Sequence, residues 1–295
     1  MKRLFTIISA LLLICALFAG CIYSPENKSD GTINIVASVY PVYIFAANVT
    51  SGVSGVSLRL MDPAQTGCLH DYQLTTGDML ALESADVFIV NGGGMESFLA
   101  NVTAKLPDLS VLNASDGVDY IADAQGNINP HAWLTVPNAV KYVGNIAAWL
   151  ESYDTEHADV YARNAQSYIA RLTALDTEMH GELDGLAHRD IVTLHEAFPY
   201  FADAFGLNIA AVVERDPNSA PSPAELENTI DIIKTVNVTA IFVEPQYSPQ
   251  AAERISNETG VPVYALNPIT GGDTALTAYE DIMRRNAAVL LEALS

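Results

Sequence analysis

Three histidines of this 295-residue chain have the residue type and the spacing of a metal site. They are His70, His131 and His195, which lie 61 (131 − 70) and 64 (195 − 131) residues apart, each where a strand or turn is expected to lead into a helix. Open α/β sheets bind ligands beyond the carboxyl ends of their strands, and neutral imidazole suits borderline divalent metals such as zinc. The three positions therefore predict a metal site, although a histidine taken alone more often has a structural or solvent role.

The elements that would position these histidines follow a repeated strand-then-helix pattern. Short apolar runs predict strands at 33–38, 57–60, 87–90, 109–112, 191–194, 209–213, 240–243 and 263–266. Helices are expected at 41–50, 78–83 and 96–105, and Ser222 and Glu225 have the spacing of a capping box. Such alternation is typical of parallel sheets with helices on both faces. The sequence therefore predicts an α/β fold with two (β/α)4-type lobes.

The run from Thr155 to Leu183 is expected to form one long helix that joins the lobes. It contains no proline, has glycine only at Gly181, and would span about 40 Å at helical rise. A stiff connector of this kind argues against wide hinge motion. Three further histidines, in and just after this run, lack a second candidate ligand one turn away and are interpreted as surface residues: His157, His180 and His188. The expected organisation is a signal peptide (1–20), a tether (21–31), an N-terminal lobe (32–152), a linker helix (153–184) and a C-terminal lobe (185–295).

The chain begins with the pattern of an export signal. Lys2 and Arg3 precede an apolar run that ends at Gly20 and Cys21, and this run is too short to span a bilayer. The stretch 17–21 resembles the lipobox of bacterial-type lipoproteins, in which the cysteine is lipidated after cleavage. We therefore expect a protein anchored to the outer face of the cytoplasmic membrane through Cys21. The alternative is an uncleaved signal anchor that merely contains a cysteine.

Charge and cysteine content narrow the functional classes. The formal net charge is −21, with no basic patch, and such a chain repels the phosphates of nucleic acids. Of three cysteines, Cys15 and Cys21 belong to the signal and its cleavage point. Cys68 alone remains in the mature chain, so no internal disulfide can form and the hydrophobic core must hold the fold.

Five stretches together carry a resemblance to a known family. They are HDYQL (70–74), PHAWL (130–134), HEAFPYF (195–201), FVEPQ (242–246) and YEDIMRRN (279–286). In these stretches the chain resembles the metal-binding lipoproteins of ABC importers for zinc and manganese, and is more similar to the zinc-uptake (ZnuA-like) branch. The resemblance implies two lobes joined by one backbone helix, with the metal bound in the cleft between them.

Carried over by position, the resemblance implies that His70, His131 and His195 are metal ligands. Members of the manganese branch can have a carboxylate at the third position, and an all-imidazole set favours Zn²⁺ over Mn²⁺. For the fourth position the family commonly has an aspartate, where this chain has Asn267. An amide is a weaker zinc ligand than a carboxylate, so water or Cys68 could complete the site, although Cys68 also fits an ordinary small buried thiol.

Ligating imidazoles usually donate their second N–H to a carboxylate or carbonyl. The candidates for this supporting role are Glu244, just beyond an expected strand, and Glu214.

The resulting functional hypothesis is a lipid-anchored extracytoplasmic receptor. It would capture Zn²⁺, with Mn²⁺ as the alternative ion, and deliver it as a monomer to an ABC permease driven by a cytoplasmic ATPase. Two alternatives stay open. A surface adhesin of the same fold has no specific pointer in the sequence, and a zinc hydrolase is disfavoured because no H-E-x-x-H arrangement accompanies the histidines. We therefore expect no catalytic residues and no enzyme activity.

Overall fold

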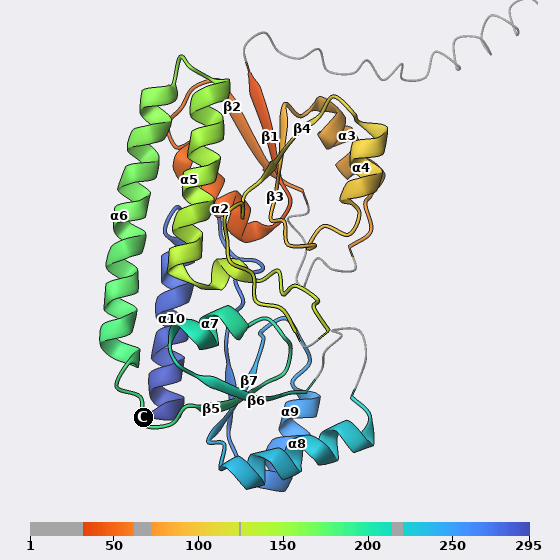
Figure 1. The fold of residues 1–295 in the computed structure, drawn as a ribbon, viewed down its shortest axis with the longest axis vertical. Coiled ribbons are helices and arrows are strands. Elements are labelled where there is room, and N and C mark those ends of the chain that lie inside the picture. The colour runs from red at the N-terminus through yellow and green to blue at the C-terminus, as the bar shows by residue number, and fades with distance from the viewer. Residues whose placement is uncertain (1–31, 62–71, 124, 214–220) are drawn as a thin grey trace, which may run out of the picture. The chain divides into compact units, whose positions relative to one another are not determined.

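The computed structural model describes residues 32–61, 72–123, 125–213 and 221–295. In this part of the chain the strands form two parallel sheets of four strands each (Figure 1). The first has the order β2-β1-β3-β4 and the second the order β6-β5-β7-β8, so the two sheets share one topology. The strands are β1 (Ile33–Ala37), β2 (Val56–Leu60), β3 (Val87–Val90), β4 (Ser110–Asn113), β5 (Asp190–Thr193), β6 (Asn208–Val212), β7 (Ala240–Val243) and β8 (Val263–Ala265). The predicted strands and the α/β fold class are confirmed, because each strand end lies within one residue of its prediction.

Burial explains why these short apolar runs become strands. Every residue of the inner strands β3 and β7 is buried. A parallel sheet covered on both faces gives its inner strands this continuous apolar character rather than strict alternation. Among the described residues, His195, Glu244 and Asn267 come within two residues after the carboxyl ends of β5, β7 and β8.

The first sheet is flanked by helices that begin and end at recognisable signals. They are α2 (Tyr40–Val49), α3 (Thr76–Ser84), α4 (Leu99–Lys105), the short 3₁₀ helix η2 (Ala132–Leu134) and α5 (Val136–Tyr153). Thr75 and Asp78 form a capping box at the start of α3. Helix α4 was predicted to begin at Glu96 but begins at Leu99. The reason is that the Glu96 carboxylate accepts hydrogen bonds from the Ser38 hydroxyl and from backbone N–H groups at 91 and 92.

The loop between β3 and α4 contains Gly92, Gly93 and Gly94, all with positive φ. At Gly92 a side-chain carbon would collide with the side chain of Asn113. Glycine is therefore required there for both the backbone conformation and the close approach.

Helix α6 (Ala158–Leu183) is the predicted linker, with 26 residues or about 40 Å of helix. It begins at Ala158 rather than at Thr155, because the Asp154 carboxylate accepts a hydrogen bond from Tyr161 and pairs with His157, which becomes the residue before the first turn. Its buried side chains form one stripe: Tyr161, Ala165, Tyr168, Leu172, Leu175, Met179 and Leu183. This stripe packs against α5, α2 and the last helix of the chain.

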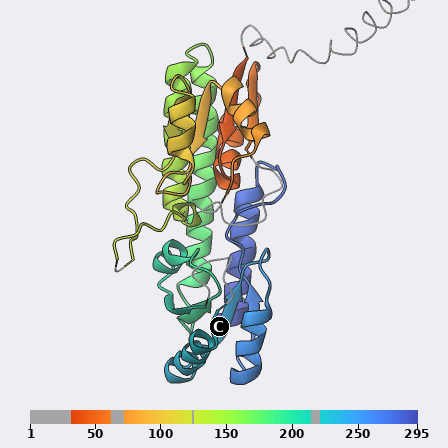
Figure 2. The ribbon, with the colours of Figure 1, turned by 90° about the vertical axis from the view of Figure 1, so that its right-hand side faces the viewer.

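The second sheet carries α7 (Pro199–Ala204), α8 (Pro223–Val236), α9 (Gln250–Thr259) and α10 (Ala278–Leu294). The predicted capping box of Ser222 and Glu225 is present at the start of α8. Helices α8 and α9 pack against each other. Helix α8 also packs against β6, and α9 packs against β7 and β8. Helix α10 lies alongside α6 in both views (Figures 1 and 2).

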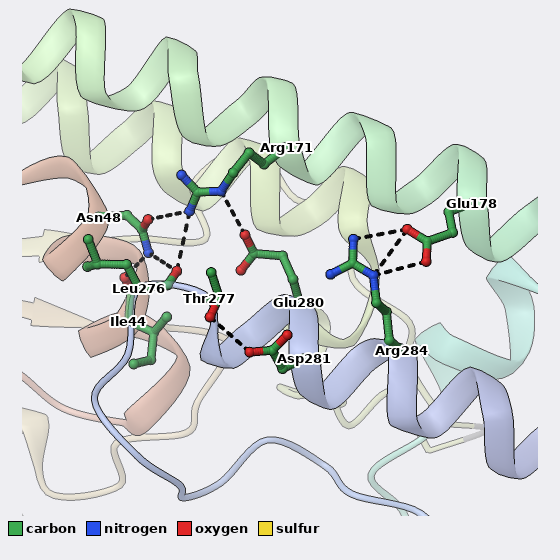
Figure 3. A network of polar contacts seen from close by, with 9 residues as sticks. All are labelled: Ile44, Asn48, Arg171, Glu178, Leu276, Thr277, Glu280, Asp281 and Arg284. Carbon is green, nitrogen blue, oxygen red and sulfur yellow. Dashed lines mark hydrogen bonds and ion pairs between the residues drawn. The ribbon is translucent and has the colours of Figure 1, made fainter.

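Polar contacts join α6 to α2 and to α10 (Figure 3). Arg171 of α6 donates to Glu280 of α10 at 3.0 Å and to Asn48 of α2 at 2.7 Å. Two helical turns further along α6, Glu178 forms an ion pair with Arg284 of α10 at 2.9 Å. Residues Ile33–Ser295 accordingly form one compact unit. The predicted boundaries between lobe, linker helix and lobe stay predictions. Within the described residues no helix combines the length and the apolar character needed to cross a bilayer.

Candidate metal centre

His131 lies in a buried turn at the entrance to η2. Its relative exposure is 1%, and its ring centroid is 5.2 Å from that of Trp133. The carbonyl of the preceding Pro130 accepts a hydrogen bond from the side chain of Asn91, which follows β3. The turn that carries the predicted ligand His131 is therefore held by the loop after β3.

His195 comes two residues after β5, at the carboxyl end of that strand. The backbone N–H of Leu194 donates to the carbonyl of Phe242 in β7. His195 therefore directly follows the residue that makes this hydrogen bond between the strands. His195 is 3% exposed, and its ring centroid lies 5.5 Å from that of His131 at an interplanar angle of 82°. The structure thus brings together two of the three predicted ligands, one from each half of the chain.

Four predicted residues lie outside the described residues. His70 and Cys68 belong to 62–71, Glu214 to 214–220 and Cys21 to 1–31. Within the described residues no group of three or more His, Cys, Asp or Glu side chains stands close enough to hold a metal ion. His131 and His195 therefore form two members of a predicted set whose third member, His70, precedes the described segment that begins at 72.

Glu244, the predicted supporting carboxylate, is the first residue after β7. Strands β5 and β7 pair in register at Thr193 and Phe242, so His195 and Glu244 are each two residues past one rung of the sheet. Glu244 is 2% exposed, and its Oε2 accepts a hydrogen bond from Gln246 at 2.6 Å. Its Oε1 has no hydrogen-bond partner among the described residues. Burial raises the pKa of this carboxyl to about 8, because desolvation disfavours the charged form.

Asn267, the predicted fourth ligand, shapes its own loop. Its Oδ1 accepts from the backbone N–H of Ile269 at 2.8 Å, and its backbone N–H and C=O both bond the side chain of Asn286. Ile269 has φ of 61°, a strained value for a β-branched residue. The Trp133 indole donates to the carbonyl between them, at Pro268, at 2.9 Å. The loop after β8 is thereby fixed to the His131 turn, and ligation by Asn267 stays a prediction.

Sequence reasoning missed Asn129, two residues before His131. Its Oδ1 lies 3.0 Å from both the backbone nitrogen and the Nδ1 of His131, and its Nδ2 donates to the carbonyl of Glu196 at 2.7 Å. The only sequence signal was local, because Asn often bonds backbone two residues on. The contact with Glu196 depends on the tertiary fold.

The remaining histidines lie elsewhere, as predicted for surface residues. His157 pairs with Asp154 at 2.7 Å, and His180 pairs with Asp184 at 3.0 Å. His188 is exposed, just before β5. None of these three histidines makes a ring contact with His131 or His195.

Residues 35–293 match the family model described as zinc-uptake complex component A, periplasmic. The chain belongs to this zinc-uptake family. The predicted resemblance is thereby confirmed, and the match spans both sheets and the linking helices.

Full-length relatives of the zinc-uptake family carry different metal names. The chain is 30% identical over 294 residues to the manganese-binding lipoprotein MntA of Halalkalibacterium halodurans, with 97% of each protein covered. It is 26% identical over 312 residues to the high-affinity zinc uptake system protein ZnuA of Bacillus subtilis, covering 99% of this chain and 97% of that one. A solved mutant structure of the laminin-binding adhesin Lmb from Streptococcus agalactiae matches with a TM-score of 0.80 and 26% identity, over 89% of this chain and 100% of that chain.

Proposed function

We propose that this protein is an extracytoplasmic zinc receptor that captures Zn²⁺ and hands it to the permease of an ABC importer. The observation that carries the proposal is the buried contact between His131 and His195, with ring centroids 5.5 Å apart. Imidazoles from loops of two different sheets, removed from solvent and adjacent to each other, suit capture of an ion between two halves of a protein. Zinc is the cargo of such a receptor, and His70 is the proposed third ligand.

Zinc is favoured over manganese by the ligand type. Imidazole is a borderline nitrogen ligand that suits zinc, whereas manganese prefers oxygen ligands. The proposed set His70, His131 and His195 contains no carboxylate. Relatives bear either metal in their names, such as MntA and ZnuA, so ligand chemistry rather than ancestry is the reason for choosing zinc.

The proposed partners follow from the function. A permease with its cytoplasmic ATPase would receive the ion, and lipidation of Cys21 would keep the receptor beside it on the outer face of the membrane. The receptor is proposed to act as a monomer and without catalysis.

The proposal is tested by removing the two described histidines one at a time. The chain from Ile22 to Ser295 is stripped with chelator and titrated with Zn²⁺ by calorimetry, as wild type, His131→Ala, His195→Ala and, as a matched control, the exposed His188→Ala. One zinc per chain is expected for wild type and control, with affinity lowered at least 100-fold in the other two. Wild-type affinity in either ligand variant would overturn the proposal.

The likeness to the adhesin Lmb supports one second candidate, a surface adhesin. It predicts that the metal-free protein binds immobilised laminin with saturable affinity, and that His131→Ala leaves this binding unchanged. A zinc-dependent import defect on deletion, without loss of adhesion, favours the receptor.

A further inference from the structure

The carboxamide of Asn129 contacts the His131 turn with one end and the His195 loop with the other. The atom near His131 must be the oxygen, because it accepts the backbone N–H of His131 at 3.0 Å. The nitrogen then faces the carbonyl of Glu196, directly after His195, and donates to it at 2.7 Å. Both hydrogen bonds therefore require the same placement of the amide oxygen and nitrogen.

This orientation determines which nitrogen of His131 carries the proton. Nδ1 of His131 is 3.0 Å from the same amide oxygen, which can only accept. Nδ1 must therefore be the donor, and in the neutral ring Nε2 then carries the lone pair. A neutral imidazole with the lone pair on one nitrogen and the other hydrogen-bonded is the form in which histidine ligates a metal.

The backbone around Asn129 is held in place independently of the side chain. The Asn129 carbonyl accepts from the hydroxyl of Tyr200 at 2.7 Å, and that hydroxyl accepts from the backbone of Ile121 at 2.9 Å. On the other side, Asn91 holds the carbonyl of Pro130 at 3.0 Å. The amide is thus presented between the histidines by contacts with α7 and with the loop after β3.

We propose that Asn129 is a positioning residue that fixes His131 in its Nδ1–H tautomer and joins it to the backbone beside His195. The two imidazoles are thereby held in position before the ion arrives, which reduces the entropic cost of ordering these side chains on binding. The inference rests on the proposed function, since it concerns the readiness of the same site. An amide is needed for both contacts at once: a carboxylate accepts but cannot donate to the Glu196 carbonyl, and leucine does neither.

Two near-isosteric variants separate these contacts. Asn129→Asp keeps the acceptor for Nδ1–H and loses the donor to Glu196, whereas Asn129→Leu loses both. Asn127→Leu is the matched control, because this exposed asparagine of the same loop bonds, among the described residues, only Asp123. Thermal unfolding of each metal-free protein verifies that the variants are folded.

The first readout is the tautomer of His131 in the metal-free chain from Ile22 to Ser295. Histidine-selective ¹⁵N labelling, with the His131 signal assigned by its absence in His131→Ala, reports which ring nitrogen is protonated. We expect Nδ1–H in wild type, Asn127→Leu and Asn129→Asp, and a loss of this single tautomer in Asn129→Leu. An Nε2–H tautomer in wild type overturns the proposal, and this result does not depend on any variant folding.

The second readout is zinc affinity. Asn129→Leu is expected to bind 10- to 100-fold more weakly, the effect typical of losing a partner of a metal-ligating histidine. Asn129→Asp should lie between this variant and wild type, and Asn127→Leu should match wild type. Wild-type affinity in a folded Asn129→Leu overturns the inference alone, provided that His131→Ala and His195→Ala have lost binding. Retained binding in those two variants overturns the proposed function instead.

Discussion

Replacing Glu244 with glutamine should remove a pH-dependent cost to the stability of the metal-free protein. Glu244 is 2% exposed, and burial raises its pKa from 4.5 to about 8. The unfolded carboxyl releases its proton near pH 4.5 and the folded one near pH 8, so the folded state holds one more proton between these values. Raising the pH through this window therefore destabilises the fold, by about 1.4 kcal/mol per pH unit and about 3 kcal/mol in total by pH 7.

The assay is urea unfolding of wild type and Glu244→Gln, both treated with chelator, at several values from pH 5 to pH 7.5. Glutamine keeps the shape and still accepts the hydrogen bond from Gln246. The free energy of unfolding of the variant, relative to wild type, should rise by about 1.4 kcal/mol per pH unit, because all other titrating groups are common to both proteins. The exposed Glu253→Gln serves as the control for replacing a glutamate with glutamine. A pH-independent difference for Glu244→Gln would refute the reasoning.

Four further substitutions test how the site and its supporting contacts are held, each by urea unfolding at pH 7. Asn91→Leu should cost about 2–4 kcal/mol, because it leaves a buried carbonyl and a buried hydroxyl without their partner; a cost below 1 kcal/mol would contradict this. Arg171→Met should lower the free energy of unfolding by about 2 kcal/mol, because it removes the ion-pair partner of the buried Glu280 (Figure 3). Arg284→Met breaks the exposed pair with Glu178 and should lower the free energy of unfolding by under about 1 kcal/mol. Equal costs would show that burial of Glu280 does not matter. Trp133→Phe should cost about 2–4 kcal/mol through a lost indole hydrogen bond and a lost part of the core, and a neutral effect would remove the indole from the account.

The sheets could be predicted from sequence because their signal is local. Parallel strands covered on both faces are short apolar runs, and turn residues bound each of them. The starts of α4 and α6 were predicted less well for a physical reason. At Glu96 the carboxylate bonds the backbone of the preceding loop, and at Asp154 it bonds a side chain in the first turn of α6. These contacts delay the helix by three residues in each case.

Within the candidate site, the sequence predicted which residue types matter better than it predicted their burial and contacts. His131 and His195 were chosen as candidate ligands because imidazole suits a zinc site and because the resemblance of the surrounding stretches implies this role. Asn129 was not, because its role depends on a carbonyl 67 residues further along the chain. Glu244 was predicted as a supporting carboxylate, but a carboxylate after a strand is by default exposed. Its near-complete burial comes from the tertiary packing around β7 and cannot be read from neighbouring residues.

The most direct test of the central claim is competitive metal binding with the bound metal counted. The chain from Ile22 to Ser295, freed of metal, is equilibrated with Zn²⁺ in the presence of excess Mn²⁺, beside the double variant His131→Ala/His195→Ala. We predict one zinc per wild-type chain, not displaced by manganese, and none retained by the double variant. Manganese in place of zinc, or zinc held equally by the double variant, would contradict the assignment of a zinc receptor built on these two histidines.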